Sequence, residues 1–260
     1  MTDVYDEMIT NCRRIADSFP QPRFYEDCRK ELETSRRLFQ TDSTVLRCLD
    51  MISDRLRDNY GHGLSHTTKV AVEAGALALR ERERLGLCDF PSNRIGVLAL
   101  LSGLLHDICR GEKDHAKKGS REAGPILDSL PVSVHEKACI EGAIANHEAF
   151  VKPTLMPSLY GQTLSDTLYD ADKFRWGPDN FTETLWAMLR SRPVPMATVI
   201  HQFPEGIEEI SRIKNTFRSE TGRSFGPEFI SIGLRIGEEI YQFLRERFAD
   251  ELRLQYPSSG

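Results

Sequence analysis

The segment from Ile95 to Ile108, IGVLALLSGLLHDI, places the strongest constraint on how this chain folds. Its residues are apolar nearly all round a helix, whereas a helix at a protein surface is apolar along one stripe. We therefore expect this helix to be buried on most of its sides, with other elements of the chain packed around it.

The rest of the sequence predicts further helices. Apolar residues recur at helical spacing in several segments, and convincing period-2 alternation is absent from the sequence. A loop is expected over 151–161, where three prolines occur. These patterns predict an all-α fold, with helices starting near Val4, over 24–39 and 43–56, from residue 65 or 66 onward, over 116–129, 133–149 and 164–174, and from Pro227 to about 252.

The composition is ordinary for a soluble globular protein and argues against several classes. Of the 260 residues, 40% are hydrophobic and 28% are charged. The net charge is −5 and no basic block stands out, so we do not expect a nucleic-acid surface. The six cysteines form no CxxC pair, which argues against a zinc ribbon and a disulfide scaffold. The sequence contains no signal-peptide pattern and no apolar stretch of membrane-spanning length, so we expect a cytoplasmic protein.

An adjacent pair, His106-Asp107, ends the apolar segment within the sequence GLLHDICR. Ionisable groups are costly in a dry environment unless they are paired or bound to a metal. A histidine supplies a neutral nitrogen ligand, and an aspartate supplies an oxygen that can bridge two cations. The alternative is a helix C-terminus that reaches solvent, where the helix dipole favours His106.

Four more imidazole or carboxylate side chains lie at or near the ends of other predicted helices: His66, His115, His147 and Asp172. Each one alone is better explained as an ordinary residue, either a solvated or core histidine or a surface aspartate. Helices that pack in sequence can bring such positions into one pocket. Together the four therefore predict a site shared with the His-Asp pair.

The order His66 … His106-Asp107 … Asp172 resembles the H…HD…D signature of the HD superfamily of metal-dependent phosphohydrolases. The local sequences HTTKV, GLLHDICR and DADKF, which contain these four residues, are similar to the motifs of that family. The resemblance covers roughly residues 60–180. It implies metal binding and phosphohydrolase chemistry.

The resemblance also implies an architecture. We expect a compact multi-helix HD-domain fold with a metal-binding core at 59–180. Additional helices at 1–58 and 181–255 fall outside the resemblance, and their apolar stripes are most simply faces that pack on this core. We expect one structural domain over 1–255, although the C-terminal stripe is also compatible with the interface of a homodimer.

Two further histidines give the order H…HD…H…H…D, which is similar to branches of the superfamily with two metals. It looks most like the bacterial branch that hydrolyses dinucleoside polyphosphates. The resemblance implies that the four signature residues hold one ion, and that Asp107, His115 and His147 hold a second, with Asp107 bridging. This set of nitrogen and oxygen donors suits one or two divalent ions of Fe, Mn, Ni or Zn, and Mg is possible.

Two positions have a competing neighbour in the sequence. His62 precedes His66 by four residues, but Val70 keeps the family's register from His66. Asp170 and Asp172 point to different sides of a helix. The family pattern selects Asp172, so we expect Asp170 to contact solvent or a ligand residue.

The chain departs from the family after the HDI sequence. Cys109-Arg110 stands where the family often has Gly-Lys, and a cysteine does not tolerate every backbone conformation open to glycine. Arg110 preserves the cation and can hold phosphate oxygens bidentately. We expect Asp107 and Arg110 to be catalytic, and Arg110 and Lys173 to bind substrate. Further basic candidates are Lys69 and Arg175.

The expected reaction is hydrolysis of a phosphomonoester, phosphodiester or pyrophosphate bond by a metal-activated water. The expected partner is a small phosphorylated molecule, with a nucleotide as the first choice. Two alternatives stay open at this point. One is a di-iron oxygenase that uses the same ligands, and the other is a non-catalytic module that senses a nucleotide.

Overall fold

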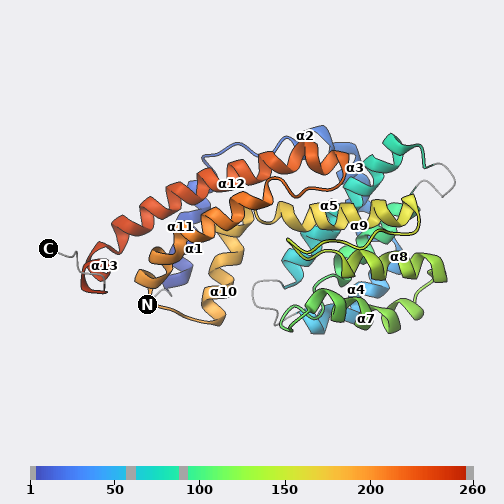
Figure 1. Cartoon of the computed structure of the whole chain (residues 1–260), viewed down its shortest axis with the longest axis horizontal. Coiled ribbons are helices and arrows are strands. Elements are labelled where there is room, and N and C mark those ends of the chain that lie inside the picture. Colours follow the sequence, from blue (N-terminus) through green and yellow to red (C-terminus); the bar gives the residue numbers. More distant parts are fainter. Residues whose placement is uncertain (1–3, 57–62, 88–92, 256–260) are drawn as a thin grey trace.

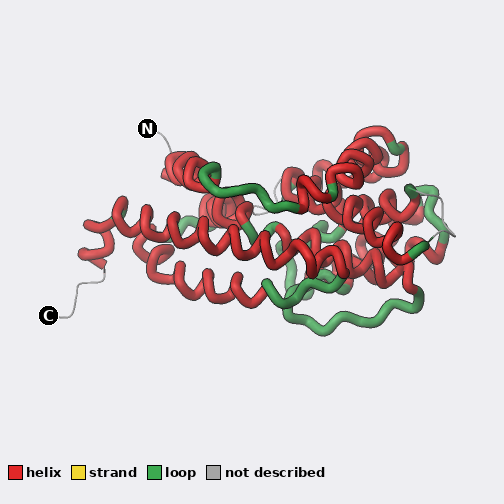
Figure 2. The backbone as a smooth tube through the Cα atoms, turned by 90° about the horizontal axis from the view of Figure 1, so that it is seen from above, coloured by secondary structure: helices red, strands yellow, loops and turns green. Residues whose placement is uncertain are grey.

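The computed structural model describes residues 4–56, 63–87 and 93–255, and within these ranges it contains helices and no strand (Figure 2). The prediction of an all-α fold is therefore confirmed. In chain order the elements are α1 (Val4–Ala16), α2 (Phe24–Asp27), α3 (Arg29–Thr41), α4 (Ser43–Leu56), α5 (Leu64–Leu85), α6 (Arg94–Leu105), α7 (His115–Asp128), α8 (Val134–Ala145), α9 (Leu159–Phe174), the π-helical turn η1 (Asn180–Thr184), α10 (Leu185–Ser191), α11 (Met196–Ile213), α12 (Glu220–Arg247) and α13 (Ala249–Gln255).

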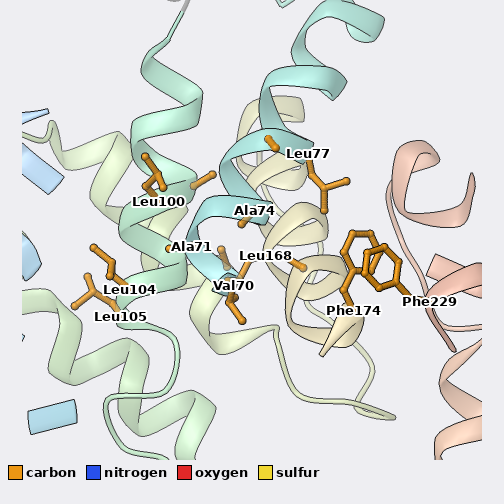
Figure 3. Close-up of a cluster of buried hydrophobic side chains, with 14 of the residues drawn as sticks. Val70, Ala71, Ala74, Leu77, Leu100, Leu104, Leu105, Leu168, Phe174 and Phe229 are labelled. Atoms are coloured by element: carbon orange, nitrogen blue, oxygen red, sulfur yellow. The ribbon is translucent and has the colours of Figure 1, made fainter. Parts of the chain in front are cut away.

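Helix α6 is the centre of the bundle. Every residue from Ile95 to Leu105 is buried, because α3, α4, α5, α8 and α9 all pack against this helix. The expectation that this segment is buried on most sides is confirmed. Figure 3 shows how side chains of α5 and α6 meet in this core, among them Ala71 and Leu104.

Helices α5 and α6 approach each other closely at Gly103. A Cβ atom added to Gly103 would lie 2.4 Å from Cα of Ala71, so only a glycine allows the two backbones to come this near. This contact fixes the start of α5 against the end of α6. It thereby brings His66, in the first turn of α5, close to His106, which follows α6.

Helix α9 begins earlier than the sequence predicted. Its N-cap is Ser158, whose side chain accepts a hydrogen bond from the backbone N–H of Gly161. This cap starts the helix at Leu159, within the predicted loop 151–161, because the capping serine satisfies a backbone donor that would otherwise be unpaired. The predicted helix 24–39 is divided at Cys28 into α2 and α3.

Helix α12 also begins earlier, at Glu220, and Pro227 lies inside it. The cause is a contact distant in sequence. The buried carboxylate of Asp170 accepts hydrogen bonds from the backbone N–H groups of Arg218 and Ser219, at 2.7 and 2.8 Å. Asp170 was expected to contact solvent or a ligand residue, and this expectation is wrong, because the side chain anchors the start of α12.

The helices are arranged along an elongated body (Figure 1). Helices α3 to α9 gather at one end, α1, α10 and α13 lie at the other, and α12 runs between them. Helix α1 packs against η1, α10 and α12, whereas α3 and α4 pack on α5 or α6. Buried apolar side chains from Met8 to Phe248 form one cluster. Among the described helices, none has the length and apolar character needed to cross a membrane.

The two ends are joined by an aromatic contact next to the candidate site. Phe174, the last residue of α9, stacks on Phe229 of α12 with ring centroids 4.0 Å apart and planes within 7°. Phe24 of α2 meets Phe174 edge to face at 5.2 Å. This contact fixes the end of α9, the helix that carries Asp172. The division into 1–58, 59–180 and 181–255 within one domain stays a prediction.

Candidate metal centre

His106 is held in one orientation at the end of α6. Its Nδ1 lies 2.7 Å from the carbonyl oxygen of Gly103, and because a carbonyl only accepts, Nδ1 carries the proton. Nε2 therefore bears the lone pair of the neutral ring. This atom is buried and has no hydrogen-bond partner among the described residues. A buried acceptor without a partner is costly unless something positive occupies the space before it.

His147 repeats this arrangement on a different element. It follows α8, and its Nδ1 donates to the carbonyl oxygen of Ile144 at 2.6 Å. Its Nε2 is likewise buried and makes no hydrogen bond within the described part of the chain. Histidines that bind metals are usually oriented by such a bond from the other ring nitrogen. Two independent helix ends thus aim an Nε2 lone pair into the same interior space.

Asp107 lies between two pairs of histidines, and each of its two carboxylate oxygens faces one pair. Its Oδ2 is 3.4 Å from Nε2 of His106 and 3.9 Å from Nε2 of His66. Its Oδ1 is 3.4 Å from Nε2 of His147 and 3.8 Å from Nε2 of His115. The carboxylate is buried. It can therefore act as a shared ligand between two positions.

Asp172, a residue of α9, lies beside the first pair of histidines, His66 and His106. Its Oδ1 lies 3.6 Å from Nε2 of His66 and 3.7 Å from Nε2 of His106. Its Oδ2 accepts a hydrogen bond from Lys173. The structure thus brings together all six residues that the sequence predicted as ligands. We call them the His/Asp cluster: His66, His106, Asp107, His115, His147 and Asp172.

The spacing of the cluster fits divalent cations. Two subsets, His66 with the His-Asp pair and Asp107 with His115 and His147, each offer donor atoms that lie within 4.8 Å of one another. Ligands about 2.1 Å from one ion lie about 3.0 Å apart at octahedral angles and about 3.4 Å apart at tetrahedral angles. Small side-chain movements would therefore bring the observed spacing of 3.4–3.9 Å to either geometry.

The charges of the cluster also call for a cation. Burial alone lowers the pKa of His106, but the carboxylates of Asp107 and Asp172 outweigh it and raise this pKa to about 10. For Asp172, burial raises the pKa, but Lys173 and the histidines hold it well below the ordinary value. Without a metal ion, the ionised carboxylates thus favour a second proton on His106, at Nε2, where a metal ion would otherwise offset the same charge.

His115, in the second pair of histidines, differs from His106 in the direction in which its surroundings shift its pKa. Burial and the neighbouring His147 lower the pKa of His115 to about 4, so this imidazole is neutral at pH 7 and able to act as a ligand. His115 is the first residue of α7, and it follows Asp114, whose φ of 56° lies in the left-handed region. Aspartate is one of the residues that adopt this conformation most easily. The turn at Asp114 directs the start of α7 toward the cluster.

The predicted substrate-binding cations lie beside the cluster. Arg110 Nη1 is 3.7 Å from Asp107 Oδ1 and donates to His115 Nε2 at 3.2 Å. Lys173 is buried, and its ammonium group donates to Asp172 and lies over the ring of Tyr169 at 5.1 Å. Both cations are therefore within reach of an anion that contacts the cluster.

The cluster opens into a cavity of about 470 Å³. This volume is within the range of about 300–1,000 Å³ that small-molecule sites occupy. One wall is formed by four residues of the cluster, His66, His115, His147 and Asp172, together with Arg110 and Lys173. The opposite wall comes from η1, α10 and α11, far along the chain, through Asn180, Thr184, Leu185, Met188, Gly206, Glu209 and Ile210.

The other basic candidates serve the fold. Arg175 is buried and forms ion pairs with Glu73 and Asp179. Lys69 pairs with Asp179 at 3.2 Å and with Glu183 at 3.0 Å. These bonds tie α5 to the segment after α9, and Lys69 does not line the cavity of the cluster. Arg175 does line the cavity, but its guanidinium is engaged by Glu73 and Asp179.

Sequence reasoning missed most of the wall that faces the cluster. Trp176, Met188 and Glu209 line the cavity, but no motif or spacing marks them in the sequence. Cys109, which stands where the family often has glycine, does not need the conformational freedom of glycine, because it is not among the described residues with positive φ. His62, the competing candidate for the first ligand, lies outside the described residues.

Two solved structures resemble the chain. One is named a predicted HD superfamily hydrolase and comes from an uncultured Thermotogales bacterium; it is 23% identical, the match covers 83% of this chain and 97% of that chain, and the TM-score is 0.45. The other comes from Lactobacillus plantarum; it is 17% identical, with 81% and 99% covered and a TM-score of 0.50. No family model and no curated protein matches the sequence.

The order in which the helices carry the cluster residues agrees with the H…HD…D order in the sequence. His66 opens α5, His106-Asp107 follows α6, and Asp172 lies near the end of α9, so the H…HD…D residues converge on one point. The chain has an HD-domain fold. The His/Asp cluster fits a metal site of the HD type. The assignment to the dinucleoside-polyphosphate branch stays a prediction.

Proposed function

We propose that the His/Asp cluster holds two divalent cations on either side of Asp107. The observation that carries this proposal is the division of its carboxylate, with Oδ2 facing His106 and Oδ1 facing His147, each at 3.4 Å. Supporting evidence is the buried Nε2 atom of each of these histidines, which has no hydrogen-bond partner in the described ranges. Iron, manganese, nickel and zinc suit these donors, and magnesium is possible.

We propose further that the protein hydrolyses a phosphoester or pyrophosphate bond. Bound divalent cations supply a water with a pKa near neutrality and polarise the phosphate. Arg110 would bind the phosphate oxygens and offset the charge that develops on them during attack. Lys173 would orient the phosphate from the side of Asp172. Asp107, by holding both cation positions, would keep them at a fixed separation.

The proposed substrate is small and nucleotide-like. The cavity volume of about 470 Å³ and the positively charged side chains of Arg110 and Lys173 beside the cluster support a phosphorylated small molecule as the substrate. Preference for a nucleotide rests on the resemblance of the sequence to the HD superfamily. A homodimer and a cytoplasmic location likewise stay predictions.

Metal analysis followed by an activity panel tests the proposal. The protein is stripped with a chelator and reloaded separately with Mn, Fe, Ni, Zn and Mg. It is then assayed for metal content and for phosphate release from nucleotides, phosphomonoesters, phosphodiesters and pyrophosphates. We expect release that depends on the metal and is lost in His147→Ala. The matched control is His135→Ala, because His135 is an exposed histidine of α8 outside the cluster.

Three outcomes would contradict phosphohydrolase activity. Oxygen consumption that requires iron, without phosphate release, would indicate the di-iron oxygenase. Tight nucleotide binding without turnover, with any of the five metals, would indicate a sensing module. Full activity after complete removal of metal would exclude the metal-dependent reaction itself.

A further inference from the structure

A second, apolar cavity adjoins the cavity of the metal centre. It has a volume of about 160 Å³ and lies between η1, α10 and α11. We call it the apolar groove. The groove and the metal-centre cavity share four lining residues, so the two spaces meet there: Asn180, Leu185, Gly206 and Ile210.

The groove has the chemistry of a hydrocarbon site. Its lining contains no charged side chain, and its polar side chains are those of Asn180 and Gln202. Phe181, Phe203 and Ile207 are among its apolar residues. An apolar cavity of about 150 Å³ is large enough to bind benzene. The groove therefore has room for one ring or a short alkyl chain, and it offers no cation for a second phosphate.

Apolar side chains at this place are exposed to solvent. Met188, at the metal-centre cavity, is 40% exposed, and Val194, at the groove, is 39% exposed. Exposed apolar surface gains free energy when it is covered, roughly in proportion to the area removed from water. A ligand that lies across both cavities would cover these two side chains.

Gly206 lies at the junction and leaves it open. It occupies the interior of α11, where a glycine costs about 1 kcal/mol of stability relative to alanine. A Cβ atom added to Gly206 would have no heavy atom within 4 Å, so close packing does not require a glycine. Its local effect is to leave free the space between the groove and the metal-centre cavity.

We propose that the substrate carries a hydrocarbon group beside its phosphate and that this group passes Gly206 into the apolar groove. The inference rests on the proposed function of the metal centre, which places the phosphate at Arg110 and Lys173. From there Leu185 and Ile210 form a continuous apolar wall into the groove, because both line the two cavities. Among phosphorylated molecules, those with an apolar substituent would therefore bind better than those with a second charged group.

Binding of alkylphosphonates of two to eight carbons tests the inference without turnover. They are titrated calorimetrically into the metal-loaded full-length protein. We expect the affinity to rise about fourfold for each methylene group that the groove buries, since one buried methylene contributes about 0.8 kcal/mol. The heat capacity change should become more negative with chain length, as burial of apolar surface requires.

Substitution of Gly206 localises the effect. In Gly206→Phe the new ring would fill the junction, and the dependence of affinity on chain length should disappear. Gly206→Leu should reduce it and serves as a second variant if the phenylalanine affects folding. Glu205→Phe is the matched control, because Glu205 is an exposed neighbour on α11 that lines neither cavity; its chain-length dependence should equal that of the unmodified protein.

The inference is overturned if octylphosphonate binds no better than ethylphosphonate, if neither binds, or if Gly206→Phe keeps the full dependence on chain length. Hydrolysis of the corresponding alkyl phosphates separates this result from the proposed function. Phosphate release without chain-length dependence would leave the hydrolase in place and remove the hydrocarbon group. Binding that depends on chain length, without phosphate release from any phosphoester, would support the hydrocarbon group and contradict the proposed hydrolase activity.

Discussion

Nε2 of His147 lies 3.4 Å from Oδ1 of Asp107, the carboxylate oxygen that is not the one facing His106. One aspartate is thus shared between two groups of histidines that come from different helices. Removing a histidine from one group should therefore change the number of bound metal ions differently from removing the aspartate.

Metal stoichiometry distinguishes these cases. We expect two equivalents in the unmodified protein, one in His147→Ala, and none in Asp107→Ala, because only Asp107 contributes to both positions. Elemental analysis of purified protein measures this directly, with His135→Ala as the control that keeps two. An Asp107→Ala variant that folds and retains both equivalents would show that the aspartate is not shared.

Arg110 is expected to stabilise the transition state. Arg110→Ala should lower kcat about 100- to 1,000-fold, as loss of a comparable charge-stabilising donor does, and this decrease should exceed the rise in KM. Steady-state kinetics on the best substrate of the panel, with metal content determined in parallel, checks this. Arg121→Ala is the control, because Arg121 is exposed on α7. An unchanged kcat with intact metal would return Arg110 to a purely structural role.

The contact of Gly103 with Ala71 is expected to position the site. Gly103→Ala would place a methyl group 2.4 Å from Cα of Ala71 and push α5 away from α6. We expect a loss of about 1–3 kcal/mol in the free energy of unfolding, as overpacking in a core produces, and weaker metal binding. The matched control is Gly206→Ala, where the added atom meets open space; this variant should be up to about 1 kcal/mol more stable. Urea denaturation compares the two.

Glu136 is expected to make stability depend on acid pH. Its carboxylate accepts hydrogen bonds from Arg94 at 2.6 and 2.8 Å, and this pair, with the cap of α8 at Ser133, lowers the pKa of Glu136 to about 2. A lowered folded-state pKa means that the stabilisation is fully present above the unfolded-state pKa of about 4.3 and is lost as the pH falls toward 2.

The test for Glu136 compares the unmodified protein with Glu136→Gln by urea denaturation between pH 7 and pH 3. At pH 7 the variant should be less stable by about 1–2 kcal/mol. The difference should narrow below about pH 4.3. A difference that stays constant over this range would show that the ionised carboxylate does not stabilise the fold.

The terminal segments are expected to fold together with the core. Phe24, Phe174 and Phe229 join α2 and α12 to α9, the helix that carries Asp172. Limited proteolysis should therefore give no stable fragment near 60–180. Recovery of such a fragment with its metal bound would show that 1–58 and 181–255 are separable from the core.

The sequence was informative where short segments determine structure. The segment that becomes α6 is apolar on all sides, and a helix with that pattern has few alternatives to complete burial. Its end carries His106 and Asp107, whose charge is hard to accommodate there without a ligand. The positions of His66 and Asp172 followed from their order and local motifs.

The remainder depends on contacts between distant residues, which leave no periodic signal. Asp170 binds the backbone at Ser219, and this contact, with the serine cap, starts α12 before Pro227. The wall opposite the cluster is formed by residues such as Met188 and Glu209, which the path of α10 and α11 brings there. Neighbours in sequence do not specify that path.

The most direct test of two cations beside Asp107 is anomalous scattering from crystals of the metal-loaded protein. We expect two peaks about 3.5–4 Å apart, one on each side of the Asp107 carboxylate. The first should lie about 2 Å from Nε2 of His106 and the second about 2 Å from Nε2 of His147. A direct bond from a histidine nitrogen to the metal would measure about 2 Å. A single peak that lies more than about 5 Å from both His115 and His147 would therefore contradict the two-metal centre.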